Sequence, residues 1–230
     1  MTTAASAPAG PTTSVAPAFT LRINEIFLSI QGETTRTGLP TIFIRLTGCP
    51  LRCHYCDTAY AFHEGRTRSG TDIMAAMAGW DTRFVTVTGG EPLAQKSCLL
   101  LLQHLCDRGY DVSLETSGAI EVNDVDPRVC KILDLKTPAS GESGRNLMSN
   151  LAHMTARDQF KFVICDRGDY EWARDLVLQH QLAARSEVLF SPSHGQLPAG
   201  SLADWVLADQ LPVRVQIQLH KYLWGDVRGR

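Results

Sequence analysis

Short runs of apolar residues recur along the chain from about residue 20. Most are rich in Val, Ile, Phe and Leu and are bounded by Gly, Pro or Asp, a pattern typical of β-strands. Near-continuous apolar runs such as Phe84–Val87 indicate strands covered on both faces, as in parallel sheets. The pattern predicts eight strands, at Arg22–Phe27, Thr41–Leu46, Phe84–Thr88, Val112–Glu115, Lys131–Leu135, Gln159–Ile164, Glu187–Phe190 and Val213–Leu219.

Longer segments with apolar residues at helical spacing separate several of these strands. Thr71 or Asp72 is the expected N-cap of the first helix, and Gly109 suits the position just after the second. The segment 119–129 is too short and too polar for a full helix. We therefore expect four helices, at Thr71–Trp80, Ala94–Arg108, Asp169–Gln181 and Ser201–Leu211.

The alternation of strands and helices predicts an α/β fold with a mostly parallel sheet. About six β/α units are fewer than the eight of a closed barrel. We expect a partial, open TIM-type barrel that forms a single domain over residues 20–230. Residues 1–19, rich in Ala, Pro, Thr and Ser, are predicted to be a disordered tail without a secretory or mitochondrial signal.

The composition narrows the class of protein and the cellular compartment. The chain has 230 residues, of which 44% are hydrophobic and 20% are charged, and this balance fits one domain with a full core. The net charge of −2 argues against a nucleic-acid-binding protein, and the apolar runs are too short to span a membrane. Seven cysteines, an odd number, argue against a secreted disulfide scaffold. These features predict a cytoplasmic protein.

The cysteines fall into two groups. Cys98, Cys106, Cys130 and Cys165 are scattered in or beside apolar runs and are predicted to be small buried hydrophobic residues. The other three lie in one loop, at Cys49, Cys53 and Cys56. A four-iron cluster takes one terminal ligand per iron, so three thiolates leave one iron free for a substrate or cofactor. The alternative is a zinc site with His54 as fourth ligand, but His54 is adjacent to Cys53 and poorly placed.

Polar signatures follow five of the predicted strands. In parallel α/β folds the carboxyl ends of the strands meet at one edge, where active sites collect. We therefore expect these segments to form one active site, and they are Cys49–Thr58, Gly89–Glu91, Glu115–Ser117, Lys136 and Ser191–His194.

The spacing C-x3-C-x2-C, with the aromatic Tyr55 before the last cysteine, resembles the radical S-adenosylmethionine (SAM) superfamily. Gly89-Gly90-Glu91-Pro92 resembles the superfamily motif that binds the SAM amino group. The resemblance implies a 4Fe-4S cluster on Cys49, Cys53 and Cys56. It also implies SAM contacts from Tyr55, Cys56, Asp57, Gly90, Glu91, Glu115, Ser117, Lys136, Ser191, Pro192, Ser193 and His194.

A narrower resemblance covers nearly everything after residue 20. It rests on Asn24–Phe27, Ser29–Glu33, Phe43–Arg45, Cys56–Thr58, Asp134–Pro138 and Gln216–Lys221, which are similar to the 7-carboxy-7-deazaguanine synthase family. That family converts 6-carboxy-5,6,7,8-tetrahydropterin to 7-carboxy-7-deazaguanine, with release of ammonia, in queuosine biosynthesis. The resemblance implies Mg²⁺ as a further cofactor, a reductant such as flavodoxin or ferredoxin, and a homodimer.

The same resemblance implies further site residues. Thr58 matches a Mg²⁺ ligand, and a turn residue is the alternative. His220 and Lys221 lie in the family's C-terminal signature without an assigned role. Arg45 suits a carboxylate, with a structural ion pair as the alternative. The implied substrate contacts are Ile30, Gln31, Gly32, Arg45 and Thr88.

Two other functions compete with this interpretation. One is a radical SAM activase of a glycyl-radical enzyme or of anaerobic ribonucleotide reductase, which would act on a partner polypeptide. The segments Ser29–Glu33 and Gln218–Lys221 would have no purpose there. The other is a non-enzymatic metal-binding or RNA-binding module, against which the polar strand ends and the missing basic stripe count.

Overall fold

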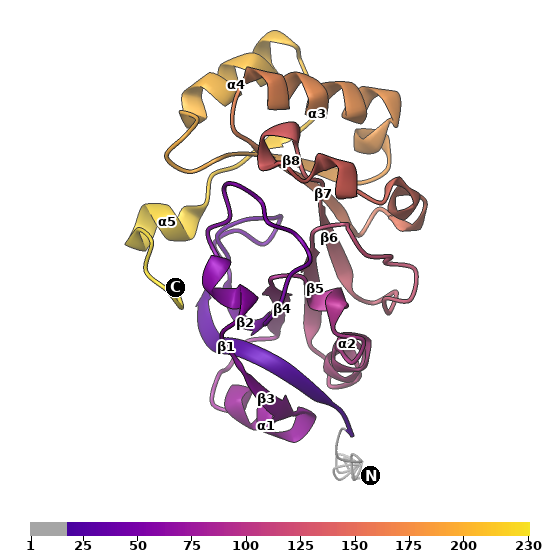
Figure 1. Cartoon of the computed structure of the whole chain (residues 1–230), viewed down its shortest axis with the longest axis vertical. Helices are drawn as coiled ribbons and strands as arrows, with labels where there is room; N and C mark the ends of the chain where they lie inside the picture. The colour runs from indigo at the N-terminus through magenta and orange to yellow at the C-terminus, as the bar shows by residue number, and fades with distance from the viewer. Residues whose placement is uncertain (1–17) are drawn as a thin grey trace, which may run out of the picture.

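The computed structural model describes residues 18–230, so almost all of the predicted disordered tail lies outside the described residues. Within residues 18–230, nine strands form one sheet in the order β3-β1-β2-β4-β5-β6-β7-β8-β9 (Figure 1). The strands are β1 (Thr20–Ile30), β2 (Pro40–Leu46), β3 (Arg66–Ser69), β4 (Phe84–Gly89), β5 (Asp111–Thr116), β6 (Cys130–Asp134), β7 (Gln159–Ile164), β8 (Glu187–Pro192) and β9 (Arg214–Val215).

From β2 to β9 every neighbouring pair is parallel, whereas β1 is antiparallel to both β2 and β3. The sheet ends at β3 and β9 and does not close, which confirms the partial, open TIM-type barrel. Val85 to Thr88 of β4 are all buried, as predicted for a strand covered on both faces. Phe160, Phe162 and Phe190 pack with Tyr170 in the fully buried core.

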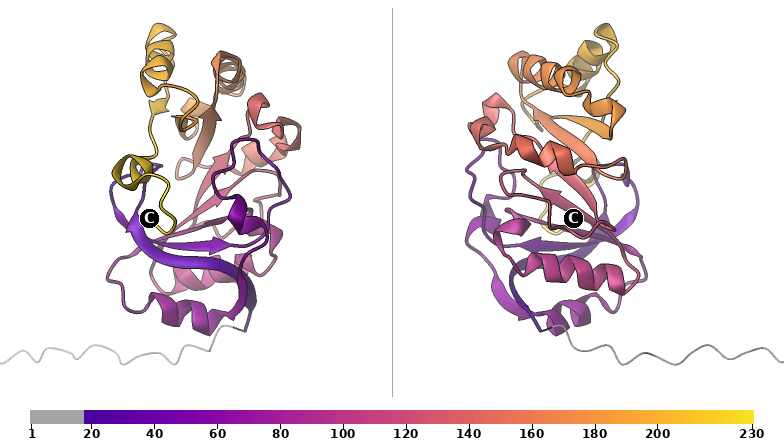
Figure 2. Two further views of the ribbon diagram at one scale, coloured as in Figure 1. Left: turned by 60° about the vertical axis from the view of Figure 1, so that its left-hand side comes forward. Right: turned by 90° about the vertical axis from the view of Figure 1, so that its right-hand side faces the viewer.

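Five α-helices accompany the sheet within the described part of the chain. They are α1 (Gly70–Met77), α2 (Cys98–Asp107), α3 (Arg167–Gln179), α4 (Ala199–Ala208) and α5 (Leu219–Trp224). The helix α5 lies on the opposite side of the molecule from α2 (Figure 2). None of the helices in residues 18–230 is long and apolar enough to cross a membrane.

Several predicted boundaries are wrong. The N-cap of α1 is Ser69, whose hydroxyl accepts the Asp72 N–H while the Asp72 carboxylate accepts the Ser69 N–H. Because Asp72 is the third residue of the helix (N3) in this capping box, it is not itself the cap. The second helix begins at Cys98 and not at Ala94, since Pro92–Ala94 forms a separate 3-10 turn.

The predicted strand Val213–Leu219 is mostly wrong. Only Arg214 and Val215 pair with β8, and Leu219 already begins α5. The Gln216 N–H still donates to the Phe190 carbonyl oxygen of β8, and its side chain bonds to the Thr34 N–H and the Ser191 hydroxyl, but the strand pairing does not continue beyond Val215. The short polar edge strand β3 was not predicted. The segment 119–129 carries no helix, as predicted.

The scattered cysteines are only partly the buried residues that the sequence predicts. Cys98 and Cys130 are buried, but Cys106 and Cys165 are half-buried.

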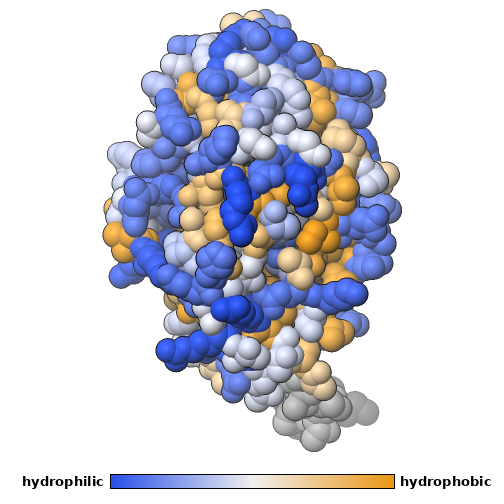
Figure 3. Space-filling view, viewed as in Figure 1, coloured by the Kyte–Doolittle hydropathy of each residue, from blue (hydrophilic) through white to orange (hydrophobic). Residues whose placement is uncertain are grey.

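Apolar surface also shows between polar residues in the middle of the face drawn in Figure 3.

Candidate active site

A cavity of about 550 Å³ lies at the carboxyl ends of the parallel strands. The five polar segments that follow separate strands all contribute to its wall, as the alternation of strands and helices predicts. The cavity is lined by eighteen of the predicted site residues, namely Ile30, Gln31, Arg45, Cys49, Cys53, Tyr55, Cys56, Asp57, Thr58, Thr88, Gly90, Glu115, Ser117, Lys136, Ser191, Pro192, Ser193 and His194. Gly32 and Glu91 are not part of the wall.

The three loop cysteines are free, half-buried and face this one cavity. Burial raises the pKa of Cys53 to about 11 even though Lys136 works in the opposite direction. Burial also raises the pKa of Cys49. Thiols of this kind become thiolates when a bound metal supplies the compensating positive charge. Three separate thiols around one cavity fit a cluster, whose irons each take their own ligand.

A single-ion site fits less well. Within residues 18–230, no group of three His, Cys, Asp or Glu side chains lies close enough to hold one metal ion. The ring of His54 lies 3.2 Å from the Ala139 carbonyl oxygen, and so it is engaged outside the cysteine set. The zinc alternative is therefore not supported.

The cysteine loop and the Gly-Gly-Glu segment approach each other closely. The Glu91 N–H donates to the Gly48 carbonyl oxygen at 2.8 Å. A Cβ atom on Gly90 would lie 2.2 Å from that same oxygen, so only glycine permits this approach. The two segments thereby form one continuous wall of the cavity.

The predicted role of Glu91 at the SAM amino group is not supported by its position. Its side chain is fully buried and lies outside the cavity wall. The carboxylate accepts the Ser117 N–H at 2.7 Å, the Ser117 hydroxyl at 2.6 Å and the Thr116 hydroxyl at 2.9 Å. Because protein donors already satisfy its carboxylate, Glu91 holds the end of β5 in position. Of Gly90 and Glu91, only Gly90 reaches the cavity.

Gln31, Thr88 and Glu115 form a connected polar group. The Thr88 hydroxyl donates to Glu115 at 2.9 Å, and the Gln31 amide reaches the other carboxylate oxygen at 3.4 Å. Burial raises the pKa of Glu115, against the influence of Lys161. This carboxyl group thus holds its proton more tightly than an exposed glutamate does.

Arg45 faces the cavity and also makes the structural ion pair that was its alternative role. Its Nε lies 2.7 Å from Glu25, and its guanidinium lies over the rings of Phe27 and Tyr60. The Tyr60 hydroxyl donates to the same carboxylate oxygen of Glu25 at 2.9 Å. These contacts fix the orientation of the guanidinium while it still faces the cavity.

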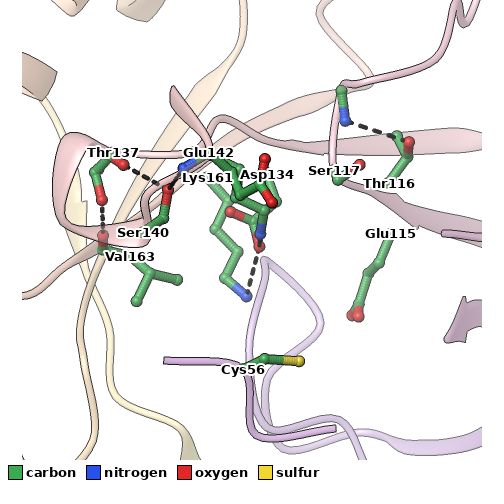
Figure 4. Close-up of polar contacts among 12 residues, drawn as sticks. Cys56, Glu115, Thr116, Ser117, Asp134, Thr137, Ser140, Glu142, Lys161 and Val163 are labelled. Atoms are coloured by element: carbon green, nitrogen blue, oxygen red, sulfur yellow. Dashed lines mark hydrogen bonds and ion pairs between the residues drawn. The ribbon is translucent and has the colours of Figure 1, made fainter. Parts of the chain in front are cut away.

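Glu33, Asp134 and Lys161 are charged residues of the wall that were not predicted as site residues. The Lys161 ammonium lies 2.8 Å from Glu33 and 3.7 Å from Asp134, and Figure 4 shows Asp134 and Lys161 side by side. Burial disfavours the charge, but Glu33 and Asp134 raise the pKa of Lys161 above its ordinary value. The sequence signal that could have identified Lys161 as a site residue was a lysine in the middle of the otherwise mostly apolar strand β7.

Three buried polar atoms of the wall have no hydrogen-bond partner within the described residues. They are Glu33 Oε1, Asp134 Oδ1 and Tyr55 Oη. Since buried polar atoms are normally satisfied, these atoms are free to contact a bound ligand. Lys136 lies 3.1 Å from the other carboxylate oxygen of Asp134.

The C-terminal segment completes the wall through Gln218, His220, Lys221, Asp226 and Arg230. The Leu219 N–H donates to the Gly32 carbonyl oxygen at 2.9 Å, and a Cβ on Gly32 would lie 1.9 Å from the His220 ring. The backbone of Gly32 thus supports α5, and its expected contact with the substrate stays a prediction.

Known proteins similar to this chain agree on one family. Residues 43–134 match the model of the Radical SAM superfamily. The 7-carboxy-7-deazaguanine synthase of Chlorobaculum tepidum is 45% identical over 213 residues, which cover 91% of this chain and 97% of that protein. The protein of the same name from Koribacter versatilis is 44% identical over 219 residues, covering 89% of this chain and 97% of its own length.

Solved structures support the same grouping. QueE from Escherichia coli superposes with a TM-score of 0.74 at 25% identity, over 87% of this chain and 95% of that chain. Streptococcus suis SuiB bound to its precursor peptide SuiA reaches a TM-score of 0.56 at 12% identity, over 74% of this chain and 46% of that chain. The second likeness concerns the fold alone.

Proposed function

Because the chain belongs to the 7-carboxy-7-deazaguanine synthase family of radical SAM enzymes, we propose that it contracts the ring of 6-carboxy-5,6,7,8-tetrahydropterin to 7-carboxy-7-deazaguanine. Ammonia is released in this step of queuosine biosynthesis. The main support from the chain itself is the meeting of three free cysteines with a buried set of charged residues in one cavity. The activase alternative is not favoured, since the similar proteins are synthases along nearly their whole length.

A 4Fe-4S cluster and SAM are the cofactors of this family. Together they supply a radical that removes a hydrogen atom from the substrate, which no side chain can do. Cys49, Cys53 and Cys56 would hold the cluster. Tyr55, Cys56, Asp57, Gly90, Ser117, Lys136 and the stretch Ser191–His194 line the cavity with these cysteines, and this supports their assignment to SAM.

The substrate would contact a different set of side chains from those assigned to the cluster and SAM. Arg45 has a fixed guanidinium suited to a carboxylate, and Gln31, Thr88 and Ile30 line the same cavity. Glu115 is hydrogen-bonded to both Gln31 and Thr88, which supports a role on the substrate side as well as at SAM. Its raised pKa suits proton transfer in a reaction that releases ammonia.

Mg²⁺ would bind at Thr58, whose side chain lines the cavity next to the cluster cysteines. Because no group of three carboxylate, imidazole or thiol ligands surrounds a single point in residues 18–230, the protein offers few ligands. Substrate oxygens and water would supply the rest, as is common for Mg²⁺.

We also propose a cytoplasmic homodimer that takes electrons from flavodoxin or ferredoxin. The oxygen-sensitive cofactor and the free cysteines support a reducing compartment. The apolar side chains of Tyr222 and Leu223 on α5 are 79% and 47% exposed, which supports an interface with another chain.

The test is anaerobic incubation of the reconstituted protein with 6-carboxytetrahydropterin, SAM, Mg²⁺ and a reductant, followed by mass spectrometry. We expect 7-carboxy-7-deazaguanine and about four irons per chain. Replacing Cys49, Cys53 or Cys56 by Ala should remove the iron, while Cys98→Ala, in the buried face of α2, should retain it. No conversion by a fully loaded protein would refute the proposal.

A further inference from the structure

Asp169 is a buried carboxylate outside the cavity wall, and the chemistry described above does not use it. Its residue is 1% exposed, in the first turn of α3. No cation pairs with it among the described residues. Instead, its oxygens accept the Ala139 N–H at 2.9 Å and the Cys165 N–H at 3.0 Å, and the Thr137 hydroxyl lies at 3.0 Å. Two of these three donors belong to the segment that follows β6.

That segment, Thr137–Glu142, is folded on itself. The Ser140 hydroxyl donates to the Thr137 carbonyl oxygen at 2.6 Å and accepts the Glu142 N–H at 3.0 Å (Figure 4). The Thr137 hydroxyl also lies 2.9 Å from the Val163 carbonyl oxygen of β7. The segment is thereby fixed to β7 and α3, and we call it the platform.

The platform holds the backbone of the cysteine loop on both sides of Cys53. The Arg52 N–H donates to the Glu142 carboxylate at 2.5 Å, and the His54 N–H donates to the Ser140 carbonyl oxygen at 3.0 Å. The contact is close, because a Cβ on Gly141 would lie 2.9 Å from the His54 ring. Gly141 also has a φ of +77°, which favours glycine.

We infer that Asp169 is a positioning residue for the iron–sulfur cluster, which acts through the platform to hold Cys53 in place. The inference rests on the proposed cluster at Cys49, Cys53 and Cys56. A loop that is ordered before metal binding loses less conformational entropy when the cluster binds. Supporting residues around a metal site commonly change its affinity by about 10- to 100-fold.

Two variants interrupt, at different points, the chain of contacts that runs from Asp169 through the platform to the cysteine loop. Asp169→Asn removes one acceptor and places an amide N–H₂ against backbone donors. Glu142→Ala removes only the acceptor of the Arg52 N–H, and Glu142 is half-buried in a loop outside the core, so the substitution does not threaten the fold. Asp175→Asn is the matched control, because Asp175 lies on the same helix with a side chain that is 67% exposed.

The experiment measures iron loss from the anaerobically reconstituted full chain to a chelator, and hydrogen exchange of residues 49–56 in the cluster-free protein. We expect iron loss to be about 10-fold faster in Asp169→Asn and in Glu142→Ala. Exchange of residues 49–56 should also increase in both, while exchange of β4 should not change. Asp175→Asn should behave as the wild type.

Wild-type rates of iron loss and loop exchange in Glu142→Ala would overturn the inference, even if Asp169→Asn fails to fold. Wild-type rates in a folded Asp169→Asn would overturn the role of Asp169. A wild-type protein that binds no four-iron cluster would instead refute the proposed function, and the two failures are thus distinct.

Discussion

The ammonium of Lys221 lies 3.0 Å from the carboxylate of Asp57, the residue directly after the last cysteine of the loop. Gln218 adds a hydrogen bond to the same carboxylate at 3.3 Å. Burial acts to raise the pKa of Asp57, but the Lys221 charge and hydrogen bond keep it below its ordinary value. Two walls of the cavity, from distant parts of the sequence, are thereby joined.

Lys221→Met should weaken substrate binding without affecting the cluster. The variant keeps most of the side-chain volume and removes the charge that holds α5 against the cysteine loop. We expect the KM for the pterin to rise by up to about fivefold, equivalent to ~1 kcal/mol for a partly exposed ion pair. Steady-state kinetics with iron content in parallel measures this. Lys96→Met, on the surface away from the cavity, should leave KM unchanged. Loss of iron in Lys221→Met would contradict the expectation.

Gly32→Ala should displace the start of α5, because the new Cβ would lie 1.9 Å from the His220 ring nitrogen Nδ1. Displacing side chains of the cavity wall by about 1 Å lowers turnover by roughly 100-fold. Hydrogen exchange of residues 219–224 should increase while iron content stays at the wild-type level. Adding His220→Ala removes the clash, and exchange should then return toward the wild type. Unchanged exchange in Gly32→Ala would show that the ring moves without α5.

Thr58→Val tests the Mg²⁺ assignment. Valine keeps the shape of threonine and removes the oxygen that lies 4.0 Å from Cys56 Sγ. Because Mg²⁺ needs near-ideal octahedral geometry, water replaces the lost ligand imperfectly. Turnover should fall and require a higher Mg²⁺ concentration, whereas iron content should not change. A Mg²⁺ titration of both proteins measures this. An identical Mg²⁺ dependence would reduce Thr58 to a turn residue.

Glu115→Gln should change the pH dependence of stability. Burial raises the pKa of Glu115 in the folded state above its ordinary value of 4.5. The folded chain therefore binds this proton more tightly than the unfolded chain, and wild-type stability falls as pH rises through the window between the two pKa values. The Tm of Glu115→Gln relative to wild type should be higher at pH 8 than at pH 4.5. Thermal unfolding at both pH values measures the difference, and a pH-independent difference would contradict it.

Local sequence determined much of the fold. The apolar run Gln159–Ile164 predicts β7 with its observed ends, since a strand buried on both faces leaves little choice of residue. The three cysteine positions also followed from sequence, because the loop that carries them is short and its spacing is specific. Parallel strands then bring Thr88, Glu115 and Lys136 to one edge of the sheet whatever their separation along the chain.

Tertiary structure decided which polar atoms remain available in that cavity. Glu91 and Gly32 look like ligand contacts in the sequence. In the fold, however, the Glu91 carboxylate accepts the Ser117 N–H and the Gly32 carbonyl oxygen accepts the Leu219 N–H. Lys161 looks like a solvated residue of a strand, yet Glu33 and Asp134 stabilise its buried charge in the wall. A run rich in apolar residues predicted a strand up to Leu219, but this segment begins α5, where the Leu219 N–H bonds to Gly32 and Lys221 pairs with Asp57. Local patterns set strands and loops, whereas a hydrogen bond or ion pair depends on a partner that only the folded chain brings within reach.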